Sequence, residues 1–193
     1  MQARRSQDER RADTQRALVS AARQLFAAKG YAATGTPEIV AAAGVTRGAL
    51  YHHYADKLAL FQTVVEQEHA LLAMATNAAT AGEDEPGPVK ALIAGGDAFL
   101  DAMQEKGRRQ ILLVDAPAVL DRARLDAINA RHGLRTLIAG VVAAIDAKAI
   151  KSVPVLPLAH LLNALFDRAA MAEPDELADY RKTIKALLRG LKT

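Results

Sequence analysis

Hydrophobic residues recur every three or four positions along most of the chain, which predicts helices rather than strands. The first stripe ends at Lys29-Gly30, and a short one follows Thr36-Pro37-Glu38, where Thr36 is the expected cap and Pro37 suits the first turn. Gly44-Val45 ends this short helix. Thr46 is the expected cap of a third helix, which ends near Tyr54. Asp56 is the candidate cap of a longer fourth helix.

The remaining sequence continues the helical pattern. The acidic Pro/Gly stretch at residues 82–88 predicts a loop, whereas the apolar run at 111–120 is expected to be helical because no partner strand is present. One long amphipathic segment should run from Leu125 to Val153-Pro154, and two Leu-rich helices follow it. We therefore expect an all-α fold of about nine helices.

The positive charge lies at the N-terminal end of the chain. The formal net charge is only +3, but residues 1–60 contain nine Lys/Arg and five Asp/Glu, a net +4, which leaves −1 for residues 61–193. Five of the eight aromatic residues fall between positions 26 and 61. A basic end is typical of a polyanion-binding segment, although a solvated charged tail explains the charge equally well.

Composition excludes several classes of protein. Without cysteine, the chain has no disulfides, thiolate metal sites or cysteine nucleophile. No apolar run approaches the roughly 18 residues that span a bilayer, and the arginine-rich N-terminus lacks the hydrophobic core of a signal peptide. We expect a cytoplasmic protein that is not associated with membranes.

Residues 36–54 have the pattern of a helix-turn-helix: a short helix, a glycine turn and a second helix. Val45, Ala49 and Leu50 are spaced to face the core. The other positions of the second helix then face outward, where arginine can read guanine, tyrosine offers a hydroxyl and a ring, and glycine permits close approach. Thr36 and Lys57 begin helices, where a hydroxyl or an ammonium can hold phosphates.

These features resemble the DNA-binding domain of the TetR (tetracycline-repressor-like) transcriptional regulators. The resemblance covers about residues 14–65, with GVTRGALYHHYADK at 44–57 as its most specific part; DAPAVL at 115–120 also resembles a segment of some members. It implies a helix-turn-helix domain at 1–56 and a helical effector-binding and dimerisation domain at 57–193. It also implies DNA contacts by Thr36, Thr46, Arg47, Gly48, Tyr51, His52 and Lys57. For His53 and Tyr54, packing inside the domain and contact with DNA are equally expected.

The resemblance further implies a homodimer that binds a double-stranded palindromic operator, is released by a small, partly hydrophobic effector, and most often represses. The Leu-rich stripes of the last two helices predict the dimer interface, formed by Leu158, Leu161, Leu162, Leu165, Ile184, Leu187 and Leu188. Candidate effector-binding residues, with plain core packing as the alternative for each, are Phe61, Leu100, Met103, Leu120, His132, Leu137, Asn163 and Phe166.

Other chemistry finds little support in the sequence. Glu66 and His69 have the spacing of half a di-iron site, but a second copy is absent, and the five histidines form no pair with metal-ligand spacing. Asp115 is interpreted as a helix cap or, second, as a ligand-binding carboxylate. Nucleotide-binding and nucleophile motifs are absent, so we expect neither cofactor nor metal nor enzymatic activity. The competing class is a helical small-molecule carrier or enzyme that does not bind DNA.

Overall fold

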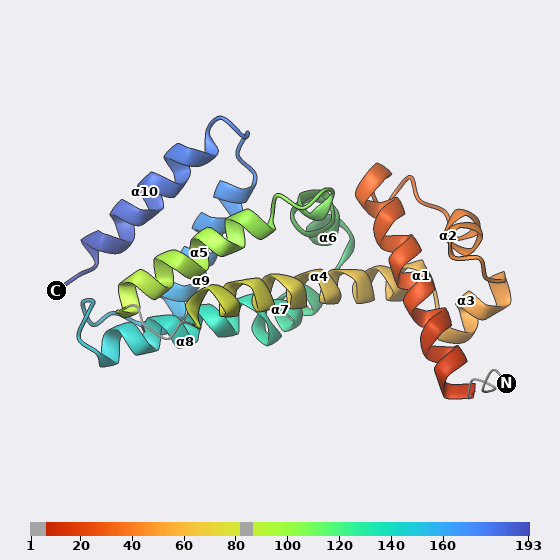
Figure 1. Cartoon of the computed structure of the whole chain (residues 1–193), viewed down its shortest axis with the longest axis horizontal. Helices are drawn as coiled ribbons and strands as arrows, with labels where there is room; N and C mark the ends of the chain where they lie inside the picture. Colours follow the sequence, from red (N-terminus) through yellow and green to blue (C-terminus); the bar gives the residue numbers. More distant parts are fainter. Residues whose placement is uncertain (1–6, 82–86) are drawn as a thin grey trace, which may run out of the picture. The chain divides into compact units, whose positions relative to one another are not determined.

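The computed structural model describes residues 7–81 and 87–193, and in these ranges the all-α prediction is confirmed (Figure 1). Most of the loop predicted at 82–88 lies outside the described residues. The α-helices are α1 (Gln7–Lys29), α2 (Thr36–Ala43), α3 (Arg47–His53), α4 (Lys57–Thr80), α5 (Pro88–Ala102), α6 (Ala116–Val119), α7 (Arg122–Arg131), α8 (Gly133–Asp146), α9 (Val155–Ala170) and α10 (Leu177–Gly190).

The described residues form two compact units. Unit 1 contains residues 7–67 and 106–120, and unit 2 contains residues 68–105 and 121–193, so α4 contributes to both. The segment 106–120 packs with the N-terminal helices, although the sequence led us to place it in the C-terminal domain. No helix in the described part of the chain is long and apolar enough to cross a membrane.

In unit 1, local sequence signals set the ends of α2 and α3. Gly35, not Thr36, is the N-cap of α2; this corrects the predicted cap, because the Glu38 carboxylate accepts the Gly35 N–H at 3.1 Å. Gly44 ends α2 in the left-handed region, with φ of 65°, which a residue with a Cβ adopts only at a cost. Thr46 caps α3 as predicted, its hydroxyl accepting the Ala49 N–H at 3.1 Å.

An aromatic cluster forms the centre of unit 1. Phe26 of α1, Tyr31 of the following loop and Phe61 of α4 lie with ring centroids 4.8–5.7 Å apart. Phe26 and Phe61 are completely buried and meet edge to face. Phe61, a predicted effector residue, therefore belongs to the core of unit 1, and its contact with an effector stays a prediction.

The apolar run at 111–120 is helical, as predicted, but it begins with an unusual form of helix. Residues Gln110–Asp115 form a π-helical stretch that leads directly into α6. Asp115 does not cap α6, which corrects the sequence interpretation; its carboxylate instead accepts hydrogen bonds from the Tyr31 N–H at 2.9 Å and the Gln110 side-chain amide at 3.0 Å.

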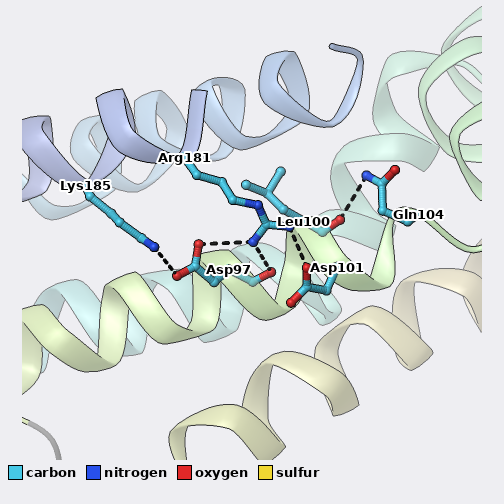
Figure 2. Close-up of polar contacts among 6 residues, drawn as sticks. All are labelled: Asp97, Leu100, Asp101, Gln104, Arg181 and Lys185. Carbon is cyan, nitrogen blue, oxygen red and sulfur yellow. Dashed lines mark hydrogen bonds and ion pairs between the residues drawn. The ribbon is translucent and has the colours of Figure 1, made fainter. Parts of the chain in front are cut away.

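Close helix packing and an ion-pair network stabilise unit 2. A Cβ on Gly96 of α5 would lie 2.3 Å from the Phe166 ring of α9, so this contact requires glycine. Figure 2 shows Arg181 and Lys185 of α10 reaching Asp97 of α5, at 3.1 and 2.7 Å, while Arg181 also pairs with Asp101. The Arg181 guanidinium thus bridges two carboxylates of α5, because one terminal nitrogen bonds Asp97 and the other bonds Asp101.

The long segment predicted from Leu125 to Val153 is divided into two helices. His132 lies between α7 and α8 with φ of −119° and ψ of −104°, outside the helical region, and Gly133 begins α8. A hydrophobic stripe can continue across such a break, which is why periodicity alone did not reveal it.

Candidate nucleic-acid interface

One face of α3 presents polar groups to solvent from a fixed backbone. Leu50 is completely buried and orients the helix. The residues predicted to touch DNA at its start and on its outer face are all exposed, namely Thr46, Arg47, Gly48, Tyr51 and His52. This distribution meets the requirement for a recognition helix, whose N-terminal half must reach base edges. Contact of each residue with DNA remains a prediction.

Tyr51, Arg47 and Thr36 form a cluster that joins the starts of α2 and α3. The Arg47 guanidinium carbon lies 5.5 Å from the Tyr51 ring centroid. Hydrogen bonds from Arg47 and then from Thr36 hold the pKa of the Tyr51 hydroxyl below its ordinary value of 10.0. The exposed phenol is thus already oriented by a cation and a hydroxyl, so less side-chain entropy needs to be lost on binding.

Lys57 forms contacts that differ from the one predicted. Its ammonium donates hydrogen bonds to the carbonyl oxygens of Tyr31 and Thr34, both at 2.9 Å, and lies 3.9 Å from the centroid of the Tyr31 ring. Two of the three donors of this ammonium thus bind the loop between α1 and α2, which the sequence did not predict. Its contact with a phosphate stays a prediction. Lys57 remains at the first residue of α4, where the backbone can face an anion.

The C-terminal end of α3 turns from solvent to core. His52 and His53 have ring centroids 5.5 Å apart, and Tyr54 is only 6% exposed, so Tyr54 packs. Burial, and then the neighbouring charges of His52 and Arg11, lower the pKa of His53 below 6.5. His53 is therefore disfavoured as a cation, and the exposed His52 is the better candidate for a DNA contact.

The predicted effector-binding residues divide between the two units. Besides Phe61, Leu120 belongs to unit 1, whereas the other six lie in unit 2. Leu100 and Met103 are each 1% exposed. A cavity of about 370 Å³ in unit 1 is lined by different residues: Tyr54, Ala59, Gln62, Thr63, Glu66 and Gln67. In the parts described, no cluster of three or more His, Cys, Asp or Glu side chains could hold a metal ion.

A half-buried carboxylate in unit 2 was missed by sequence reasoning. Asp167 on α9 accepts a hydrogen bond from the Asn163 amide at 2.8 Å, and burial raises the pKa of its carboxyl to about 6. Asn163, a predicted effector residue, is thus engaged with its helical neighbour. The signal in the sequence was an acid at i+4 from a polar residue on an otherwise apolar helix.

We expect Asp167→Asn to stabilise the protein at neutral pH. The carboxyl pKa is higher in the fold than its ordinary 3.8, so ionisation above about pH 6 destabilises the folded state, by at most about 3 kcal/mol. Asparagine keeps an acceptor for Asn163 without this charge. Denaturant unfolding should show the gain at pH 7.5 and show it shrinking as the pH falls towards 4; an equal gain at both pH values would contradict the assignment.

The structure separates the predicted interface residues into two groups. Leu162, Ile184 and Leu188 are 2–5% exposed within their own chain, so they offer little surface to a partner, and their place in a dimer interface stays a prediction. Leu158 is half-buried. The three that remain available on α9 and α10 are Leu161, Leu165 and Leu187, with exposed fractions of 64%, 37% and 51%. Large exposed apolar side chains grouped in this way are typical of an interaction surface.

A capped helix-turn-helix whose second helix presents an exposed arginine and tyrosine is typical of DNA-binding proteins. Residues 18–64 match the family model described as bacterial regulatory proteins, tetR family, and residues 89–191 match the tetracyclin repressor-like C-terminal domain. The chain belongs to the TetR family, whose members are transcriptional regulators rather than enzymes, and it is a DNA-binding transcriptional regulator.

Relatives agree with this membership. The chain is 29% identical to the Transposon Tn10 TetC protein of Escherichia coli, over 98% of this chain and 96% of that protein. It is 34% identical to the transcriptional repressor BepR of Brucella suis, over 52% and 48% of the two chains. A TetR-family regulator from Pectobacterium atrosepticum superposes with a TM-score of 0.78 and 28% identity, over 98% of each chain. RolR in complex with resorcinol has the same fold, with a TM-score of 0.69 and 15% identity over 96% of this chain and 95% of RolR.

Proposed function

We propose that this protein is a repressor that binds a palindromic operator as a homodimer and is released by a small, partly hydrophobic effector. The observation that carries the proposal is the outward-facing cluster of Arg47 and Tyr51 on α3, in which Thr36 also forms a hydrogen bond with the Tyr51 hydroxyl. Arginine can donate two hydrogen bonds to guanine, and tyrosine offers both a hydroxyl and an apolar ring to a neighbouring base or phosphate. Repression follows when a dimer occupies a promoter.

The homodimer is supported by the exposed leucines of α9 and α10. Leu161, Leu165 and Leu187 remain in contact with water in the single chain. A two-fold interface would bury these three side chains in both copies of the chain. A dimer also places two recognition helices about 34–36 Å apart, the spacing of successive major grooves on one face of DNA. Sequence-specific affinity then comes from two half-sites together.

The effector is proposed to act by linkage. The ligand binds more tightly to a conformation in which the recognition helices are misplaced for the operator. It therefore lowers operator affinity by the ratio of its affinities for the two conformations. By reciprocity, bound DNA lowers the affinity for the ligand by the same factor. Unit 2, with its apolar helices, is the proposed binding region. RolR, which shares this fold, was crystallised with resorcinol, and this supports a small ring-containing effector for the present chain.

Leu161→Glu should disrupt both assembly and specific DNA binding. A carboxylate buried at the interface loses its hydration without gaining a cationic partner, so dimerisation is disfavoured by several kcal/mol. Wild-type protein should bind a duplex selected in vitro with two chains per duplex, and the variant should be monomeric by light scattering and lose most specific affinity. Met74→Glu, at the similarly exposed Met74 of α4, is the matched control. A dimeric Leu161→Glu protein would contradict this interface.

A further inference from the structure

The 106–120 segment is fastened to the start of the helix-turn-helix. Gly107 lies against α1 so closely that a Cβ there would be 2.2 Å from the Ala27 Cβ. Eight residues further on, the Asp115 carboxylate accepts the backbone N–H of Tyr31, at the start of the loop between α1 and α2. These two contacts, at opposite ends of the segment, fix its position on unit 1.

Asp115 is itself held in place. Its second oxygen accepts a hydrogen bond from the Gln110 amide at 3.0 Å, and a Cβ on Gly30 would lie 3.5 Å from both carboxylate oxygens. The glycine therefore leaves the carboxylate close to the end of α1. A backbone N–H forms a stronger hydrogen bond with a charged acceptor than with a neutral one. The bond from Tyr31 to Asp115 can therefore hold the α1–α2 loop in place.

Tyr31 passes this constraint to α4 and to the loop that leads into α2. Its carbonyl accepts from Lys57 of α4, and its ring lies on the Lys57 ammonium and 4.8 Å from Phe61. The same ammonium binds the carbonyl of Thr34, whose hydroxyl donates to the Gly30 carbonyl at 2.7 Å. The loop that leads into α2 is thereby held by Asp115 at the Tyr31 N–H and by Lys57 at two carbonyl groups.

We propose that Asp115 is a positioning residue for DNA recognition, which holds the α1–α2 loop so that Thr36, at the start of α2, keeps Tyr51 oriented for the duplex. This inference rests on the DNA-binding function proposed above. Asp115 does not touch DNA in this scheme. Its loss lets the loop sample other conformations, and the apparent affinity for DNA falls by the fraction of molecules that are no longer competent to bind.

Asp115→Ala and Asp115→Asn test the proposal as a matched pair. Both remove one negative charge, which by itself would strengthen binding to any duplex. Only alanine removes the acceptor of the Tyr31 N–H, whereas asparagine keeps an oxygen there and the Gln110 amide can reverse to match it. We expect Asp115→Ala to lose between about 10- and 100-fold in affinity for an in vitro selected duplex, and Asp115→Asn to stay within about threefold of wild type.

Three further measurements distinguish positioning from general instability. First, affinities are measured well below the melting temperature of each variant. Second, both variants should still bind a random duplex at low salt. Third, hydrogen exchange of the Tyr31 amide should become faster in Asp115→Ala alone. Equal specific affinity for the alanine variant and wild type would overturn the inference, as would equal losses in both variants. Failure of wild-type protein to bind any selected duplex would instead contradict the proposed function.

Discussion

Gly107→Ala is expected to destabilise the protein by about 2–5 kcal/mol. The new Cβ would lie 2.2 Å from the Cβ and 2.6 Å from the Cα of Ala27, and backbone atoms cannot move aside as a flexible side chain can. Such overpacking costs roughly 1–3 kcal/mol, and φ of 79° adds about 1–2 kcal/mol for any residue with a Cβ. Denaturant unfolding followed by circular dichroism measures the sum.

Two other glycines separate these contributions. Gly44 also has a positive φ, of 65°, but a Cβ added there would meet nothing within 4 Å, so Gly44→Ala should show the conformational cost alone. Gly133 has neither a positive φ nor a neighbour within that distance, and Gly133→Ala should be neutral or slightly stabilising. A Gly107→Ala protein as stable as Gly133→Ala would mean that the 106–120 segment does not pack against α1 in solution.

The features predicted correctly from the sequence are those that depend on local chemistry. Helical periodicity, the cap at Thr46 and the turn at Gly44 each require only a few neighbouring residues, and the structure confirms all three. The outward face of α3 followed from the same reasoning, because burying Leu50 leaves Arg47 and Tyr51 exposed. For the N-terminal helices, local propensity and tertiary packing agree.

The features that the sequence did not show depended on contacts between distant parts of the chain. Asp115 resembles a cap before Ala-Pro, but Tyr31, 84 residues earlier, donates to it. Lys57 was predicted only as a phosphate ligand at a helix start, and the sequence did not show that two of its donors bind carbonyl groups of the α1–α2 loop. Similarly, a wide leucine stripe contains both buried and exposed positions, and its helical period cannot separate Leu162 from Leu161 without knowledge of the packed helices.

Arg47→Ala is expected to have the largest effect on DNA recognition. A bidentate arginine contact with guanine contributes about 1–3 kcal/mol, and a dimer loses it at both half-sites, so specific affinity should fall by about 2–6 kcal/mol. The Tyr51 hydroxyl also loses the hydrogen bond that most lowers its pKa, so that pKa should rise towards 10.0, as ultraviolet titration can measure. Fluorescence anisotropy with selected and random duplexes measures the affinity loss.

Arg47→Lys and a double-mutant cycle with Tyr51→Phe identify the origin of this loss. Lysine keeps the charge but not the two-pronged donor geometry, so it should restore binding to random duplex and little of the specific affinity. If Arg47 and Tyr51 act as a unit, the double variant should lose less than the sum of the single losses. Full recovery with lysine would mean that Arg47 contacts phosphate rather than a base, and unchanged specific affinity in Arg47→Ala would exclude this face of α3 as the reading surface.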